Sequence, residues 1–236
     1  MRAPLVFAAL CLVAGRALAA PPRVVIDPGH GGSNTGAGGV VEGLFEKRLT
    51  LALAREVAAR LEAAGVEVKL TRTSDTYVSL RERVRIANAA GPELFVSLHA
   101  NASPTHAQRG TETYILTPEA LAVDTRALRA ADAPARPDVD AATSALLDDL
   151  ERAAAQAPSA RLAERIQTRL AEVRPENRGV KQAAMDVLMG PLSPAVLVEV
   201  GFIDHPIEGV ELLRREVRAQ IAGAIAAAIL ESLEKR

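Results

Sequence analysis

Short apolar runs alternate with helical patterns along this 236-residue chain. A histidine follows two of the runs, directly or within four residues, and a third run contains a glutamate. Residues 23–26, 94–98 and 195–200 form such runs, and their length and flanking turn residues predict strands. Over 46–63, apolar residues recur about every fourth position, which predicts an amphipathic helix. This alternation predicts an α/β fold, a single domain whose sheet is covered by helices on both faces.

Further segments extend this map. Apolar and charged residues alternate over 66–70, which is typical of a half-exposed strand. Ser79 and Glu82 have the spacing of a capping box and predict the start of the next helix. The remaining expected elements are a strand at 111–116 and helices at 159–172 and 213–229.

Composition excludes several function classes. A net charge of −1 argues against a nucleic-acid binder, which needs a basic excess to neutralise phosphates. Aromatic residues make up 3% of the chain and tryptophan is absent, so a base-stacking surface is not expected. The single cysteine excludes an intramolecular disulfide and a multi-cysteine zinc site. A metal in this chain must therefore be held by histidines and carboxylates.

Residues 1–19 have the pattern of a secretory signal peptide. Arg2 is followed by an apolar run over 5–14, and Ala17-Leu18-Ala19 offers a small-residue cleavage site. The run is too short to span a membrane, which takes about 20 apolar residues. The alternative is an ordinary N-terminal helix. We therefore expect residues 20–236 to form a monomeric protein without a membrane span, exported to the periplasm or the extracellular space.

Candidate catalytic residues gather where the expected strands end. His30 and His99 each follow a strand, Glu199 lies near the end of another, and Glu46 begins the helix after the glycine-rich loop. The carboxyl ends of strands in an α/β sheet form its usual site. His30, Glu46 and His99 would give the two-histidine, one-carboxylate set of a catalytic zinc.

Glu199 would then remain free as a general base and acid. Its apolar neighbours Val198 and Val200 should raise its pKa and so favour proton transfer near neutral pH. Each of these residues has a plainer alternative. A lone histidine is usually structural or exposed, and Glu199 could pair with a buried arginine.

Four ordered motifs resemble the zinc-dependent N-acetylmuramoyl-L-alanine amidases of the amidase-3 family. They are IDPGHGG at 26–32, Glu46-Lys47, SLHAN at 97–101 and VEVGFI at 198–203. The resemblance implies a twisted, mixed and mostly parallel sheet of about six strands, with one Zn²⁺ per chain. It implies hydrolysis of the amide between N-acetylmuramic acid and the L-alanine of peptidoglycan stem peptides. It also implies that His30, Glu46 and His99 are the metal ligands, with Glu199 catalytic.

Two neighbouring residues have open roles. Asp27 would either orient His30 as a partner behind the metal ligands or only shape the turn before Pro28. Asn101 would either bind substrate or fix the loop after His99.

Residues 118–158 interrupt the alternation and are rich in alanine, aspartate and proline. Asp140 is expected to cap a helix that runs through Leu150. Regulated members of the resembled family carry an inserted helix here that covers the zinc cleft. We therefore hypothesise that this segment occludes the site and that an activator protein displaces it. The alternative is a surface loop.

The resemblance predicts a role in cell-wall remodelling or daughter-cell separation. Two other functions stay open at this point: a zinc carboxypeptidase acting on wall peptides, and a non-catalytic peptidoglycan-binding protein. Four intact candidate residues argue against the second, since a relic is expected to have lost one.

Overall fold

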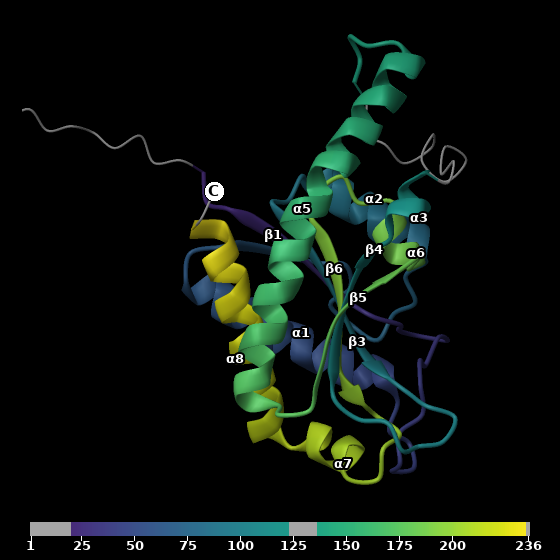
Figure 1. Cartoon of the computed structure of the whole chain (residues 1–236), viewed down its shortest axis with the longest axis vertical. Helices are drawn as coiled ribbons and strands as arrows, with labels where there is room; N and C mark the ends of the chain where they lie inside the picture. Colours follow the sequence, from purple (N-terminus) through teal and green to yellow (C-terminus); the bar gives the residue numbers. More distant parts are fainter. Residues whose placement is uncertain (1–19, 123–135, 235–236) are drawn as a thin grey trace, which may run out of the picture.

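A computed structural model describes residues 20–122 and 136–234, and its centre is a six-stranded sheet in the order β2-β1-β3-β6-β4-β5 (Figure 1). The strands are β1 (Arg23–Pro28), β2 (Glu67–Leu70), β3 (Leu94–Asn101), β4 (Thr111–Leu116), β5 (Asn177–Ala183) and β6 (Ala195–Phe202). All neighbouring pairs are parallel except β4 and β6, which are antiparallel. The expectation of a mixed, mostly parallel sheet is confirmed.

Helices cover both faces of this sheet, as the alternation predicts. They are α1 (Glu46–Ala63), α2 (Leu80–Ala90), α3 (Pro118–Ala122), α5 (Ala141–Val173), α6 (Asp186–Met189), α7 (Glu208–Leu213) and α8 (Arg215–Glu234). On one face, α1, α5 and α8 pack a large apolar core that includes Val96 of β3. On the other, α2 and α6 cover a smaller core that includes Phe95. The second core leaves the carboxyl end of that face to polar side chains.

Local signals in the sequence explain several helix ends. The Ser79 hydroxyl accepts a hydrogen bond of 3.2 Å from the Glu82 amide, so the expected cap of α2 is present. Asp140 accepts hydrogen bonds of 3.0 Å from the amides of Ala142 and Thr143 at the start of α5. These caps fix where the two helices begin.

One prediction of separate helices is wrong. The segments expected at 140–150 and 159–172 form a single helix of 33 residues, α5, with Pro158 inside it. Proline removes one helical hydrogen bond and usually costs about 3 kcal/mol. The helix continues because the next turn is anchored: Ser159 donates to the Ala155 carbonyl at 2.8 Å and accepts from the amide of Ala195 at 2.9 Å.

The described part of segment 118–158 lies at the opposite end of the sheet from His99 and Glu199. Because β4 is antiparallel to β6, α3 follows β4 at the end where β6 begins. The first turns of α5 extend beyond the body at that end, whereas α7, which follows β6, lies at the other (Figure 1). Residues 123–135 lie outside the described residues, so occlusion of the site stays a prediction.

The proposed signal peptide, 1–19, also lies outside the described residues. Among the helices that the structure describes, none is long and apolar enough to cross a membrane.

Candidate active site

The turn after β1 presents His30 in a backbone conformation that few side chains adopt. Its φ is 59°, in the left-handed region, where histidine is tolerated better than bulky or branched residues. The buried Arg83 fixes this turn by donating to the carbonyl oxygens of Pro28 at 2.7 Å and His30 at 2.6 Å. Such strain persists only where the surroundings impose it, as at functional sites.

Asp27 acts on the same turn through Arg83 and does not contact the His30 ring. Its Oδ1 accepts from Arg83 at 2.6 Å and its Oδ2 accepts from Ser97 at 2.7 Å, while Thr71 also donates to Oδ1. Of the two roles left open, these contacts favour shaping of the turn.

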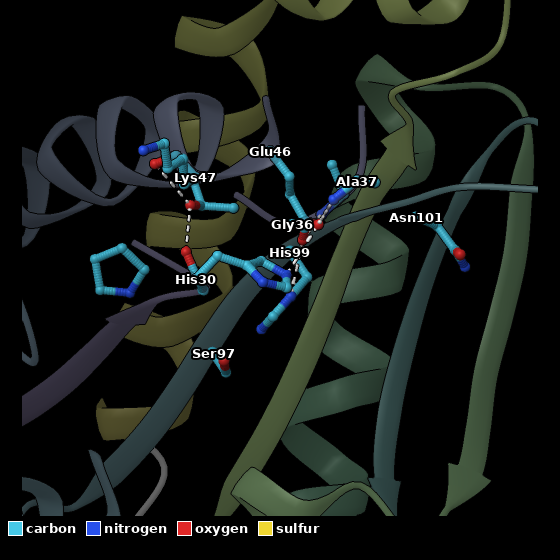
Figure 2. Close-up of polar contacts among 12 residues, drawn as sticks. His30, Gly36, Ala37, Glu46, Lys47, Ser97, His99 and Asn101 are labelled. Carbon is cyan, nitrogen blue, oxygen red and sulfur yellow. Dashed lines mark hydrogen bonds and ion pairs between the residues drawn. The ribbon is translucent and has the colours of Figure 1, made fainter. Parts of the chain in front are cut away.

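The structure brings His30, Glu46 and His99 together at the carboxyl ends of β1 and β3. Nε2 of His30 lies 2.9 Å from Oε2 of Glu46, and Nδ1 of His99 lies 2.9 Å from Oε1. One ligand atom of each residue lies within 4.8 Å of the other two. Figure 2 shows the three side chains pointing toward one another from separate elements.

Hydrogen bonds from neighbouring residues orient the side chains of His30 and Glu46. Oδ1 of Asn34 lies 2.9 Å from Nδ1 of His30. An amide oxygen only accepts, so Nδ1 carries a proton, and Nε2, which lies against Glu46, is the nitrogen available to a metal. The amides of Ala37 and Ala100 donate to the two oxygens of Glu46 at 2.9 and 3.0 Å. Asn34 was not predicted from the sequence, because a glycine-rich loop does not show which of its side chains folds back onto His30.

Glycine is required where the chain passes closest to this cluster. A Cβ on Gly29 would overlap the imidazole of His99. At Gly36, whose φ is 68°, a Cβ would lie 2.5 Å from Oε2 of Glu46 and 2.7 Å from the His30 ring. These two glycines let the loop close around the candidate ligands.

Burial and mutual attraction compete in setting the charges of the cluster. Burial opposes ionisation of Glu46, but hydrogen bonds from His30 and His99 outweigh it and hold the pKa of Glu46 well below its usual range. Burial alone would lower the pKa of His99, yet its hydrogen bond to Glu46 leaves that pKa raised. An anionic carboxylate between two imidazoles favours a cation at this position.

Glu199 lies beside this cluster without belonging to it. It is the register partner of His99 on the neighbouring strand, so both side chains leave the sheet on the same face. Among the described residues, no group forms a hydrogen bond with its buried Oε2, and no arginine pairs with it. Burial, helped by repulsion from Glu46 and Glu112 and opposed by attraction to His99, raises the pKa of Glu199 to about 7. A carboxyl with this pKa exchanges protons readily near neutral pH.

Asn101 lies apart from the histidines (Figure 2) and contacts Glu112 of β4. Its Nδ2 donates to Oε2 of Glu112 at 3.2 Å, and its Oδ1 accepts from the Ala102 amide at 2.8 Å. These contacts favour a role in fixing the chain after His99. The sequence reasoning missed Glu112 because an acidic residue in a short alternating strand resembles an exposed one.

An open pocket of about 250 Å³ adjoins the histidines on the β1 side. His30, Asn34 and His99 line one wall of it, and Leu80 and Val187 line another. The space beside the candidate metal ligands is therefore large enough to admit part of a substrate.

Comparison with known proteins agrees with this geometry. The family model described as N-acetylmuramoyl-L-alanine amidase matches residues 24–231. N-acetylmuramoyl-L-alanine amidase AmiA of Salmonella typhimurium is 36% identical over 216 residues, which cover 88% of this chain and 74% of the relative.

Solved structures show the same fold. AmiC2 of Nostoc punctiforme, an N-acetylmuramoyl-L-alanine amidase, aligns with a TM-score of 0.69 and 32% identity, covering 90% of this chain and 97% of that one. The N-acetylmuramoyl-L-alanine amidase of Clostridium difficile 630 aligns with a TM-score of 0.73 and 26% identity, covering 92% and 100%. On its fold, its clustered side chains and the match over nearly all the described residues, this chain belongs to the N-acetylmuramoyl-L-alanine amidase family, amidase-3.

Proposed function

We propose that this chain hydrolyses the amide that joins the lactyl group of N-acetylmuramic acid to L-alanine in peptidoglycan. One observation carries the proposal. His99 and Glu199 are register partners on adjacent strands, so a metal-ligating group and a proton-accepting group act on the same side of the sheet. Amide hydrolysis needs both, because water must be deprotonated and the leaving nitrogen protonated.

The side chains present fit one Zn²⁺. His30 and His99 offer nitrogens and Glu46 an oxygen, and three protein ligands of this kind leave a position open, as in catalytic zinc sites. Zinc bound there would polarise the substrate carbonyl and make water more acidic. The ion pairs that Glu46 forms with the two histidines mark where a cation would be held.

Glu199 supplies the proton transfers in this proposal. Its unpartnered Oε2 accepts a proton from the attacking water and then delivers it to the nitrogen of the departing L-alanine. A pKa of about 7 suits both steps, since neither protonation state is strongly favoured at neutral pH. Val198 and Val200 belong to the core on the opposite face of β6, so the burial of Glu199 comes from groups on its own face and not from these sequence neighbours as expected.

The biological setting follows from the same proposal. A wall-cleaving enzyme must leave the cytoplasm, which agrees with the signal-peptide pattern at 1–19. We place the protein in the periplasm or outside the cell, acting on peptidoglycan in wall remodelling or daughter-cell separation. An activator protein that displaces segment 118–158 remains part of the hypothesis.

Digestion of purified peptidoglycan by zinc-loaded protein, followed by mass spectrometry, tests the proposal. We expect release of intact stem peptides that begin with L-alanine. Glu199→Gln should lose this product, because an amide cannot accept the proton. Glu62→Gln is the matched control, since Glu62 is exposed on α1 and should leave the product unchanged.

Other products would contradict the proposal in distinct ways. Shortened peptides still attached to sugar would identify a carboxypeptidase. Zinc binding with no product from polymeric wall or from soluble muropeptides would leave an occluded enzyme or a peptidoglycan-binding protein as the two explanations.

A further inference from the structure

A cluster of polar side chains on β4 and β5 lies beside His99 and Glu199, on the same face of the sheet. Glu112 of β4 is the register partner of Glu199, so the row runs from His99 through Glu199 to Glu112 on one face of the sheet. Tyr114 lies two residues further along β4 on the same face and pairs in register with Lys181 of β5. The proposed function uses none of these three side chains.

Glu112 is buried, and both of its carboxylate oxygens accept hydrogen bonds. Lys181 donates to Oε1 at 2.6 Å, and Arg178 donates to the same oxygen. Tyr114 donates to Oε2 at 2.6 Å. Burial opposes ionisation of Glu112, but these bonds outweigh it and hold the pKa of Glu112 below its usual range. The carboxylate is therefore charged and fixed in place.

Two cations, Lys181 and Arg178, contact the single Glu112 carboxylate. These three side chains alone therefore carry about one net positive charge, beside a Glu199 whose charge depends on pH. The Lys181 and Arg178 side chains keep 36% and 34% of their surface exposed. Among the described residues, Lys181 uses its ammonium only toward Glu112, so further N–H groups remain for a ligand.

The backbone and an aromatic ring also fix Arg178. The register between β4 and β5 shifts between Thr111 and Thr113, and the resulting bulge re-aims the residues opposite. The guanidinium carbon of Arg178 lies 5.4 Å from the centre of the Phe202 ring. Nη2 donates to Gln108 at 3.3 Å. Both cations are thus held in position before any ligand arrives, which lowers the entropy lost on binding.

We propose that Lys181 and Arg178 form a subsite that binds a free carboxylate of the stem peptide, on the residue that follows L-alanine. The inference rests on the proposed function. Neighbouring strands are about 4.8 Å apart, so side chains on β4 and β5 lie roughly 5 to 10 Å from Glu199. An extended peptide covers about 3.5 Å per residue, so this span reaches the second residue beyond the cut bond. A free α-carboxyl at that residue can form charged hydrogen bonds with both cations, whereas an amidated one cannot.

Two muropeptides that differ only at this α-carboxyl, free in one and amidated in the other, provide the test. Wild-type protein should cleave the acid with a kcat/KM about tenfold higher, mainly through a lower KM, as a charge-assisted hydrogen bond to a partly exposed cation allows. Lys181→Gln should bring the ratio of the two kcat/KM values toward one. Lys181→Arg, which keeps the charge, should retain most of the preference.

The matched control is Lys69→Gln, because Lys69 is exposed on β2 at the opposite edge of the same sheet. It should leave the ratio unchanged. Thermal unfolding of each variant shows whether the fold persists, and the comparison of two substrates within one variant cancels any loss of active protein.

Two results would overturn the subsite. Wild-type protein could cleave the acid and the amide equally, or Lys181→Gln could lower both rates by the same factor. The cations would then only neutralise Glu112. Failure to cleave either muropeptide or polymeric wall at the amide would instead overturn the proposed function.

Discussion

Replacing Glu199 by glutamine should remove activity and, above neutral pH, stabilise the metal-free protein. Glu199 has a buried Oε2 without a partner and a pKa of about 7, against an ordinary 4.5. Folding therefore makes its ionisation harder. Each tenfold change in an acid constant corresponds to about 1.4 kcal/mol, so complete ionisation in the fold costs about 3 kcal/mol. Because part of the side chain reaches the cleft, we expect about 2 kcal/mol.

The sign follows from linkage. A carboxyl with a raised folded-state pKa contributes stability that is fully present below its unfolded pKa, near 4.5, and is lost as pH rises through about 7. Glutamine does not titrate. The difference in unfolding free energy between wild type and Glu199→Gln should therefore shift by about 2 kcal/mol in favour of the variant between about pH 5 and pH 8.5.

Urea unfolding of both proteins in a chelator, at those two pH values, measures this shift. The two histidines and other groups titrate in the same range, but they cancel when the variant is compared with wild type at each pH. Glu62→Gln, an exposed carboxyl on α1, should show no such shift. A constant difference at both pH values would refute the assignment of a raised pKa. A difference that shifts in favour of wild type as pH rises would mean that a partner stabilises the ionised Glu199.

Three further outcomes are expected. Gly29→Ala should lower zinc affinity and hydrolysis while circular dichroism stays native, because the new Cβ meets the His99 ring; unchanged zinc binding by calorimetry would contradict this. Arg83→Met should lower the urea unfolding free energy by about 3–5 kcal/mol, since it leaves the buried Asp27 carboxylate without the cation that forms an ion pair with it; a loss under about 1 kcal/mol would count against that pair. A chelator should abolish hydrolysis, and zinc at about 100 times its Kd should restore activity and add about 2.7 kcal/mol of stability; activity that survives dialysis against chelator would exclude a required metal.

The strands that carry the site could be predicted because their signals are local. Strands β1, β3 and β6 are apolar runs framed by turn residues, and parallel strands place their carboxyl ends together. That rule alone brings His30, His99 and Glu199 to one edge. The apolar stripe of α1 likewise turns Glu46 inward at its first residue. The positions of these four groups follow from periodicity and chain direction.

The edge strand β5 and the supporting contacts could not be predicted in this way, although the other edge strand, β2, was. Strand β5 is polar and contains Gly179, because the edge of a sheet does not demand an apolar pattern. The hydrogen bonds from Arg83 to Asp27 and from Lys181 to Glu112 span 56 and 69 residues of chain. No spacing rule links residues so far apart. The unbroken α5 was missed because packing overrides the local preference of Pro158 to end a helix.

The geometry of the candidate metal ligands depends on groups that would not touch the metal. Arg83 and Arg72 are both buried and together bind the carbonyl oxygens of Pro28, Gly29 and His30, which form the turn that carries the first histidine. Burial and repulsion from Arg83 lower the pKa of Arg72 to about 10, so two cations are held side by side against their own repulsion. Such an arrangement persists only because carbonyl dipoles and Asp27 balance it. The turn is therefore set by folding, and zinc would enter a site whose ligands already face one another.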